Sequence, residues 1–291
     1  MVTGILIGAL GLAALVQQTD TLVQADGATR LQAQLQRGEV VVRTWDRDAV
    51  QVNAAHAPNR ALEVRRSGRT LTLVVDAQRG RGPSGPVDLE LTVPRGFDLD
   101  LEGMAVRVDI QGTEGNVEVT TIQGPIQVRG GRGSILLESV NGEITVEEAR
   151  GNIRVNAVAG AITISGSSGD ISAESVSGSI TLEDIVSRQV EARTVSGPLR
   201  YEGSIEDGGR YTFGTHAGEV WLHLPGDMNA RVSAVTLAGD IRVDFPGAPD
   251  TAVHAQGLPG LREKRLTFET GNASARVSVE TFAGTLHILR R

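Results

Sequence analysis

The middle of the chain alternates apolar and polar positions in short units that each begin with glycine. Glycine recurs every nine residues from Gly115 to Gly178, and the units read GNVEVTTIQ, GPIQVRGGR, GSILLESVN, GEITVEEAR, GNIRVNAVA, GAITISGSS, GDISAESVS and GSITLEDIV. Their third and fifth positions are aliphatic, whereas the second, fourth and sixth are mostly polar. Because a period of two is that of a strand with one buried face, each unit predicts one short strand. The glycine predicts a corner, where a positive φ or a close approach is expected.

The eighth position of the units reveals a longer period. Over the first seven units it alternates between large and small residues, which are Ile122, Gly131, Val140, Ala149, Val158, Ser167 and Val176. The true repeat is therefore a coil of 18 residues with two strands and two unlike sides. Stacking of coils at about 4.8 Å places equal positions in columns. We expect the large and small residues to face each other across a flattened interior.

The coils lengthen beyond the regular region. Gly197 follows Gly178 after 19 residues, and Gly218 and Gly239 follow at intervals of 21. Residues 246–265 form an insertion rich in Gly, Pro and Ala, after which the pattern resumes as ARVSVETFAGTLHIL. The chain then ends in Arg290-Arg291, a basic pair that we expect to blunt the edge of the last strand.

These patterns predict an all-β chain whose main part is a β-solenoid, a single-chain stack resembling a β-helix. The solenoid is expected over 104–291, with regular coils at 115–187 and longer coils at 197–291. Residues 29–103 contain less regular strands, which predict a β cap or the first coils of the stack. A stack needs such a cap because an open end exposes apolar residues and strand edges.

The first residues form an apolar, uncharged run, MVTGILIGALGLAALV. Its length is that of a signal-peptide core and is short for a membrane span, which needs about 20 residues. We therefore expect a signal peptide over residues 1–18, cleaved between 14 and 25, and an extracytoplasmic protein in the periplasm, on the cell surface or secreted. An uncleaved anchor, which alone would bring the chain to a membrane, and a buried N-terminal element are the alternatives.

Composition narrows the class of protein. Gly is 36 of 291 residues and aromatics are only 3%, which favours a thin, layered core of small aliphatics. The formal net charge of −7 argues against a nucleic-acid groove, which needs a basic footprint. The absence of cysteine excludes disulfides, thiolate nucleophiles and cysteine-based zinc sites.

Taken in order, these motifs resemble those of a known family. A strand with Trp-Asp-Arg-Asp-x-Val lies between Gly38 and Val50, a second strand ends in Val-Pro-Arg-Gly at 93–96, and Gly-x-Ile-x-Val repeats follow. This order, over residues 29–291, resembles the bacterial putative-adhesin family, a domain of unknown function. The resemblance implies a β-solenoid at the cell surface or in the periplasm, and it supplies no catalytic residue. The 246–265 insertion and a loop at 77–86 depart from the simplest family pattern.

One candidate binding patch lies in the longer coils. Trp221, Arg242 and His287 share the third position after their corner glycines, which predicts an outward column. An exposed Trp there would stack on a sugar ring or contact a partner. We favour a different interpretation, in which the 246–265 insertion folds over Trp221; a metal site is the least favoured reading. His216 is expected in or near the core, and Trp45 is expected to pack within the cap.

Other candidate chemistry is weak. The repeats lack the aspartate column of calcium-binding β-rolls. Thr145, Thr163 and Thr181 form one outward column, but mixed neighbours make it a solvated strand face and not an ice-binding array. The acid pairs Glu147-Glu148 and Glu183-Asp184 are the only candidates for glycosidic acid–base chemistry. We therefore predict no catalytic residue, no cofactor and no metal.

The function predicted from the sequence is a non-enzymatic, adhesin-like structural or interaction module of the bacterial cell envelope. Its partner would be an unidentified protein or glycan at the cell surface. Two alternatives remain open, a sensory or regulatory ectodomain in envelope stress signalling and a carbohydrate-active β-helix enzyme.

Overall fold

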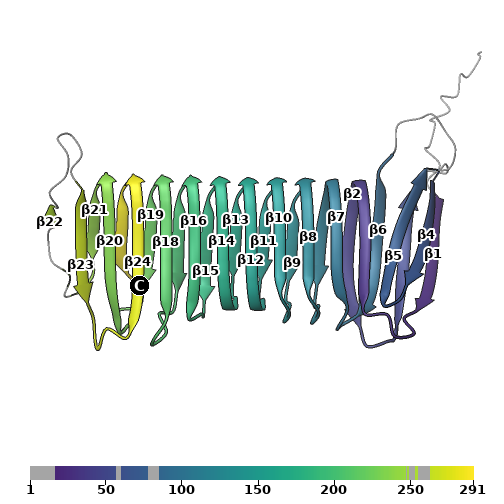
Figure 1. Cartoon of the computed structure of the whole chain (residues 1–291), viewed down its shortest axis with the longest axis horizontal. Helices are drawn as coiled ribbons and strands as arrows, with labels where there is room; N and C mark the ends of the chain where they lie inside the picture. Colours follow the sequence, from purple (N-terminus) through teal and green to yellow (C-terminus); the bar gives the residue numbers. More distant parts are fainter. Residues whose placement is uncertain (1–16, 57–59, 78–84, 247, 249–252, 255–262) are drawn as a thin grey trace, which may run out of the picture.

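The chain is an all-β solenoid whose strands lie side by side along one long axis (Figure 1). The structure is a computed structural model that describes residues 17–56, 60–77, 85–246, 248, 253–254 and 263–291. The predicted signal sequence therefore lies almost wholly outside the described residues, as do most of the 246–265 insertion and most of the 77–86 loop. Within the described part of the chain, no helix is long and apolar enough to cross a membrane.

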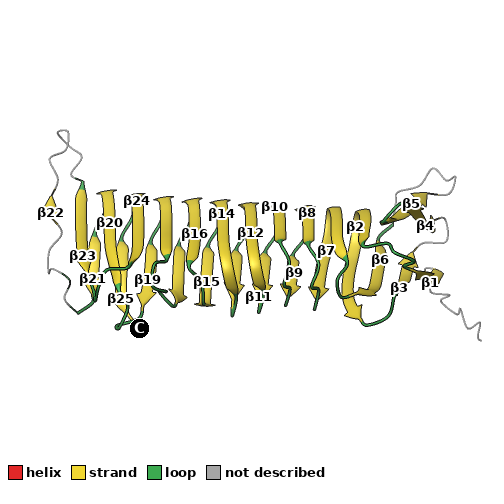
Figure 2. Cartoon of the chain, turned by 60° about the horizontal axis from the view of Figure 1, so that its bottom comes forward, coloured by secondary structure: helices red, strands yellow, loops and turns green. Residues whose placement is uncertain are grey.

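Each regular coil contributes one strand to each of two parallel sheets (Figure 2). The long-strand sheet contains β8 (Val117–Gln123), β10 (Ile135–Asn141), β12 (Arg150–Ala159), β14 (Ser168–Ser177), β16 (Gln189–Ser196) and β18 (Arg210–Ala217). The short-strand sheet contains β9 (Ile126–Arg129), β11 (Ile144–Glu147), β13 (Ile162–Ser165), β15 (Ile180–Ile185), β17 (Leu199–Gly203) and β19 (Val220–Leu224). In the regular coils, strands pair with a shift of 18 residues, as in Ile135↔Ile153, which confirms the predicted two-strand repeat.

The core consists of aliphatic columns between the two sheets. The third-position residues Ile135, Ile144 and Ile153 are fully buried, and so are the fifth-position residues Val146 and Val155. Fully burying one such side chain contributes about 1.5–3 kcal/mol. No single coil encloses its own apolar residues, because their other neighbours belong to the coils above and below, so stability depends on stacking.

The repeated glycines lie where two coils turn against each other. An added Cβ at Gly142, Gly160 or Gly178 would overlap the carbonyl oxygen of the corresponding glycine one coil earlier. Gly133 has the same relation to Gly115 at the opposite corner. Close approach of backbone to backbone is therefore what requires glycine at these corners.

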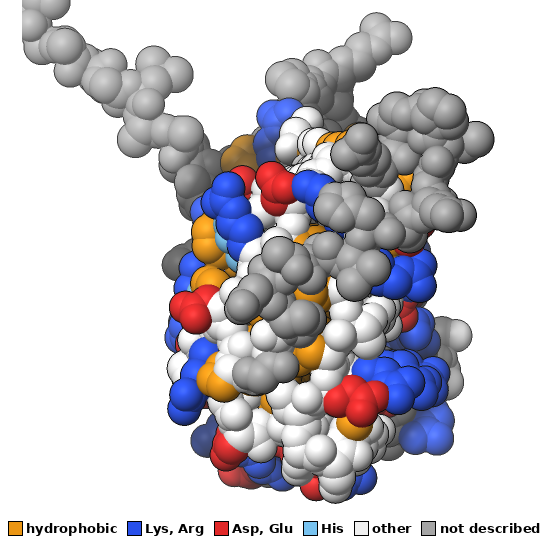
Figure 3. All heavy atoms as spheres, turned by 90° about the vertical axis from the view of Figure 1, so that its left-hand side faces the viewer, with side chains coloured by type: hydrophobic (Ala, Val, Ile, Leu, Met, Phe, Trp, Pro, Cys, Tyr) orange, Lys and Arg blue, Asp and Glu red, His pale blue; other side chains and the backbone are white. Residues whose placement is uncertain are grey.

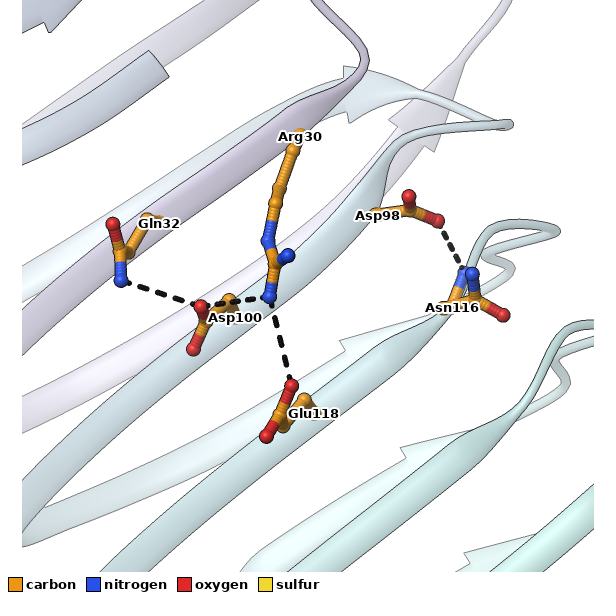
Figure 4. Close-up of polar contacts among 6 residues, drawn as sticks. All are labelled: Arg30, Gln32, Asp98, Asp100, Asn116 and Glu118. Carbon is orange, nitrogen blue, oxygen red and sulfur yellow. Dashed lines mark hydrogen bonds and ion pairs between the residues drawn. The ribbon is translucent and has the colours of Figure 1, made fainter. Parts of the chain in front are cut away.

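Polar side chains close the gaps between coils at the corner that leads into the long strands. The backbone N–H of Asn116 donates to Oδ1 of Asp98 at 2.8 Å, and the N–H of Ser134 donates to Oδ1 of Asn116 at 3.0 Å. On the outer face nearby, Arg30 Nη2 lies 2.9 Å from Asp100 and 3.6 Å from Glu118 (Figure 4). These contacts link three neighbouring strands without entering the core.

The N-terminal end of the stack combines parallel strands with outer strands that pair antiparallel. These elements are β1 (Gln17–Gln24), β2 (Arg30–Trp45), β3 (Ala49–His56), β4 (Arg60–Ser67), β5 (Thr70–Ala77), β6 (Val87–Pro94) and β7 (Asp98–Gln111). Strand β2 is parallel to β7 on one side and to β5 and β6 on the other. Beyond them β4 pairs with β5, and β3 and β1 extend from β6, all antiparallel. Trp45 is half-buried at the end of β2, where its Nε1 donates to the carbonyl of Ala49 at 2.7 Å and Arg47 lies over its ring.

The C-terminal end does not stack in sequence order. Its elements are β20 (Ala230–Ala238), β21 (Ile241–Asp244), β22 (Val253–His254), β23 (Lys264–Glu269), β24 (Ala275–Ala283) and β25 (Leu286–Arg290). Strand β24 pairs with β18 on one side and with β20 on the other, and β25 lies in the same way between β19 and β21. The coil of residues 275–290 is thus inserted between two coils that precede it in the sequence (Figure 1).

This insertion corrects the prediction for the basic C-terminal pair. Because β25 has a partner strand on each side, Arg290 and Arg291 do not protect a free edge. Arg291 instead reaches back to earlier coils, with Nη2 3.2 Å from Asp184 and Nε 3.3 Å from Glu202. The 21-residue spacing of Gly218 and Gly239 suggested direct stacking, but the matching sequence around Gly284 takes the position between them.

The prediction that the large and small residues at position eight face each other in the interior is wrong. Val140 and Val158 are 47% and 49% exposed, whereas Ala149 is buried. On the long-strand side the alternation runs uninterrupted to the corner, so position eight points outward. On the short-strand side the strand stops earlier, and a left-handed residue such as Glu148 (φ 56°) turns position eight inward.

Candidate functional site

A groove of about 920 Å³ runs along the outer face of the long-strand sheet. It crosses the strands, so every coil from β8 to β20 contributes to it in the same way. Each long strand supplies a buried position seven at its floor and outward positions six and eight at its sides. The groove is therefore a product of the repeat.

Hydroxyl side chains occupy most of the floor positions. They are buried, and the column consists of Thr121, Ser139, Ser175, Thr194, Thr215, Thr281 and Thr236, with Ala157 in the third coil. Thr194 and Thr215 donate their Oγ1 hydroxyls to the carbonyls of the corner residues Gly178 and Gly197, at 3.2 and 3.4 Å. These bonds satisfy carbonyl groups at the tight corners, which is a structural role.

One side of the groove is formed by part of an exposed apolar ladder, which we call the stripe and which continues past the groove to Ile122 and Met104. In stacking order it consists of Met104, Ile122, Val140, Val158, Val176, Val195, His216, Phe282 and Leu237. The exposed fractions of its valines are 47–51%, and Phe282 is 41% exposed. Isolated apolar residues on a surface are ordinary, but a continuous patch of this kind marks an interaction surface.

The other side of the groove is acidic. Glu138, Glu174 and Glu280 line it, and the one cation among its lining residues, Arg193, forms an ion pair with Glu191. Around the sides of the molecule, acidic and basic side chains are interspersed (Figure 3). The groove therefore combines an apolar stripe with a row of polar side chains, in which Asn156 donates to Glu138 at 3.2 Å and Arg193 lies on the strand next to Glu174.

His216 lies in the stripe and not in the core, which corrects the sequence prediction. It occupies position eight of a long strand, where the alternation points outward, and its side chain is exposed. Its ring stacks on that of Phe282, with centroids 4.7 Å apart and an interplanar angle of 13°. The prediction for His216 failed for the same reason as the prediction for position eight, because both assigned an outward-facing position of the long strands to the interior.

The structure brings Trp221, His287 and Arg242 together on the short-strand sheet. Strand pairing aligns Trp221 with His287 and His287 with Arg242, so His287 lies between the other two. The rings of Trp221 and His287 are stacked, with centroids 3.7 Å apart and planes within 2°. One face of the indole is thus occupied by His287, which leaves less of it for a sugar ring. Most of the insertion expected to cover Trp221 lies outside the described residues.

His287 is nearly buried in this stack, with 7% of its surface exposed. Burial lowers the pKa of His287 from its ordinary value of 6.5, Arg242 lowers it further, and Glu219 acts in the opposite direction. The neutral imidazole is therefore the form that this site favours. Among the described residues, no group of three or more His, Asp or Glu side chains is placed to hold a metal ion.

This lowered pKa predicts a stability that falls in mild acid. Because the unfolded chain binds a proton to His287 more readily than the folded chain does, the free energy of unfolding decreases as the pH falls below about 6.5. His287→Phe keeps an aromatic ring beside Trp221 but cannot titrate. Urea unfolding at pH 8 and pH 5.5 should show a smaller acid-induced loss for this variant, and an equal loss in both proteins would refute the assignment.

The acid pairs proposed for glycosidic chemistry do not face one another across a cleft. Glu147 is held by Arg129, whose Nε donates to it at 2.7 Å, and Glu148 occupies the left-handed corner. Asp184 occupies the equivalent left-handed corner two coils away and pairs with Arg291. Thr145, Thr163 and Thr181 do form the predicted outward column.

The groove was not predicted from the sequence, although the sequence contained a signal for it. Thr121, Ser139 and Ser175 place a hydroxyl at position seven, directly before an aliphatic residue. If strict alternation is continued past position five, position seven points inward and position eight outward. A column of valines on the solvent side of successive strands then defines the stripe.

The chain matches one family model over almost its whole length. The family model described as Toastrack DUF4097 matches residues 28–289. A crystal structure of a putative cell adhesion protein from Clostridium sporogenes aligns over 95% of this chain and 100% of its own, with 10% identity and a TM-score of 0.27. A putative adhesin from Parabacteroides distasonis aligns over 72% of this chain and 93% of its own, with 12% identity and a TM-score of 0.30. No curated protein matches the sequence.

Proposed function

Because the chain belongs to the Toastrack DUF4097 family, we propose that it is a non-enzymatic, adhesin-like interaction module of the bacterial cell envelope. The observation that carries this proposal is the groove with its exposed stripe. A contiguous apolar patch on a protein surface often marks an interaction site. The groove side chains are aliphatic, hydroxyl and carboxylate groups in a regular array, an arrangement suited to recognition of an extended partner surface.

We place the protein outside the cytoplasm because of its apolar N-terminal run, MVTGILIGALGLAALV. Fractionation of expressing cells, followed by N-terminal sequencing, tests this location. Export with a new N-terminus between residues 14 and 25 would support the signal peptide. Since β1 begins at Gln17 and pairs with β3, the cut also decides whether this edge strand remains.

The groove is expected to be the main contact surface. Replacing Val140 and Val176 by serine removes apolar area from the stripe without changing any buried residue. On arrays of glycans and extracellular matrix proteins, this double variant should bind at least about tenfold more weakly than the unchanged chain, the size expected for loss of central apolar contacts.

Two control variants make the array experiment specific. Thr145→Ser and Thr181→Ser lie on the short-strand sheet of the same coils, and they should leave binding unchanged. Trp221→Ala tests the aromatic column independently. Binding that survives the stripe variant but is lost with Trp221→Ala would move the contact surface to that column, and no binding by any protein would count against an adhesin-like role.

A further inference from the structure

We propose that three arginines on the outer face of the long-strand sheet bind an anionic glycan, one that carries sulfate, phosphate or carboxylate groups. They are Arg210 in β18, Arg276 in β24 and Arg231 in β20, and we call them the arginine row. The site goes beyond the proposed function, because the arginine row lies at the beginning of these strands, whereas the stripe lies near their end. The two surfaces can therefore be tested separately.

The inserted coil completes the arginine row. Strand pairing aligns Arg210 with Arg276 and Arg276 with Arg231, so Arg276 lies between the other two. Their strands β18, β24 and β20 lie side by side (Figure 1). At about 4.8 Å per strand, the row extends for about 10 Å across the sheet. The residue after each arginine is buried, as Tyr211 is, so the arginines point outward, and all three are exposed.

The arginine row replaces side chains that have a structural role in the earlier coils. There the same column consists of uncharged and acidic residues, which are Asp98, Asn116, Ser134, Asn152, Asp170 and Gln189. The first two accept backbone N–H groups from the next coil, which arginine cannot do. The N–H groups of Arg210 and Arg276 donate instead to the carbonyls of Arg188 and Gly209, at 2.7 and 2.9 Å. The corner therefore does not require the arginine side chains.

The positive charge of the arginine row is only partly neutralised. Nε of Arg231 donates to Oε1 of Glu269 at 2.6 Å. In the described part of the chain, neither Arg210 nor Arg276 has an acidic side chain within ion-pair distance. Asp207, three residues before Arg210, accepts hydrogen bonds from two other side chains. Like charges aligned on neighbouring strands destabilise a sheet, and a bound anion removes that repulsion.

Hydroxyl groups lie beside the arginine row on the same face. Two residues further along each strand, pairing aligns Thr212 with Ser278 and Ser278 with Ser233, and Ser233 is aligned with Thr267 of β23. Arginine donates through a planar fork that matches the oxygens of carboxylate and phosphate groups. Hydroxyl side chains donate and accept, as the hydroxyls of a sugar do. The two rows together thus offer partners for both parts of an anionic sugar.

Nucleic acids and anionic membranes fit this surface less well. Both need a larger basic area, and the chain as a whole has a net charge of −7. Neither row contains an aromatic side chain on which a base would stack. Acidic side chains also border the hydroxyl row, since Glu280 lies two residues beyond Ser278 and Glu191 is aligned with Thr212. They confine an anionic ligand to a narrow strip, which a single glycan chain fits.

Binding to immobilised heparin, polygalacturonate and phosphomannan, with neutral dextran as the blank, tests the proposal. The unchanged full chain should bind at least one of the three anionic glycans, with an affinity that falls as salt is added. Arg210→Gln/Arg276→Gln should bind at least about tenfold more weakly. Arg150→Gln/Arg154→Gln is the matched control, because it removes the same charge from exposed positions of β12, and it should retain its affinity within about twofold.

The preferred glycan identifies the anionic group, because the three carry sulfate, carboxylate and phosphate respectively. Equal affinities of the two arginine variants, tighter binding to duplex DNA than to every glycan, or no binding to any anionic glycan at low salt would overturn the proposal. So would a lower free energy of urea unfolding in Arg210→Gln/Arg276→Gln, since removal of repulsion should leave it unchanged or higher. Val140→Ser/Val176→Ser should bind these glycans like the unchanged chain, so failure of the arginine row leaves the proposed role of the groove standing.

Discussion

Replacing Gly178 by alanine is expected to destabilise the protein by about 3 kcal/mol or more, the upper range for forced overpacking. An added Cβ would overlap the carbonyl oxygen of Gly160 in the preceding coil, and the side chain of Ser175 lies close by. The neighbouring atom is backbone, so it cannot move aside without separating the two coils. Urea unfolding followed by far-ultraviolet circular dichroism measures the change in the free energy of unfolding.

Gly166→Ala is the matched control for this substitution. Gly166 has a left-handed backbone (φ +57°), but an added Cβ would have no neighbour closer than 3.7 Å. Its replacement therefore introduces only the strain of alanine at positive φ, about 1 kcal/mol. The same column accepts Glu148 and Asp184 at φ 56° and 50°, which shows that a side chain fits there. If both variants lost equal stability, backbone strain and not close approach would explain the corner glycines.

A chain ending at Ser274, which lacks the inserted coil, is expected to lose order throughout its last coils. Strand β24 is the partner of both β18 and β20, and β25 is the partner of both β19 and β21. Without them, the apolar residues Tyr211, Val232 and Leu222 lose their neighbours in the gap. Hydrogen exchange should show loss of protection over residues 210–244, while the regular coils at 115–187 stay protected.

Removal of Arg290 and Arg291 alone is the control, and it should leave residues 210–244 protected. Retained protection in the chain ending at Ser274 would contradict the expectation. If 230–244 stays protected, β20 and β21 have moved directly onto β18 and β19, as the 21-residue spacing of Gly218 and Gly239 would allow. That result would mean that the inserted coil selects the stacking order but is not needed for a closed stack.

The sequence was sufficient for the repeat and insufficient for the order of the coils at the C-terminal end. Nine-residue glycines with period-two alternation define strands, corners and the 18-residue register, because all three depend on neighbours close in the chain. The position of the inserted coil, in contrast, depends on which of two nearly identical segments pairs with β18. The segments ARVSAVTLAG at 230–239 and ARVSVETFAG at 275–284 fit the same position, and nothing local states which one follows β18.

The candidate sites could likewise be predicted only where they depend on local sequence and not on the stacking order of the coils. The column of Trp221, His287 and Arg242 was predictable because its members share one position relative to the corner glycine. The order of the three residues, with His287 in the middle, depends on the stacking order of the coils and was therefore not predictable. The groove was missed for a different reason: large aliphatics such as Val140 and Val158 were taken as interior on the strength of their type, although the alternation of the strand assigns them to solvent.

The coil of residues 275–290 at one end, and β2 between β6 and β7 at the other, confine the irregular pairing to the two ends of the molecule. Between them, each unit such as 142–159 contacts only copies of the same pattern. Duplication or loss of one 18-residue unit there would change the length of the molecule by about 4.8 Å and leave both ends intact. The groove would grow or shrink by the same step, so the reach of its contact surface can change through unit number alone, without the invention of a new residue.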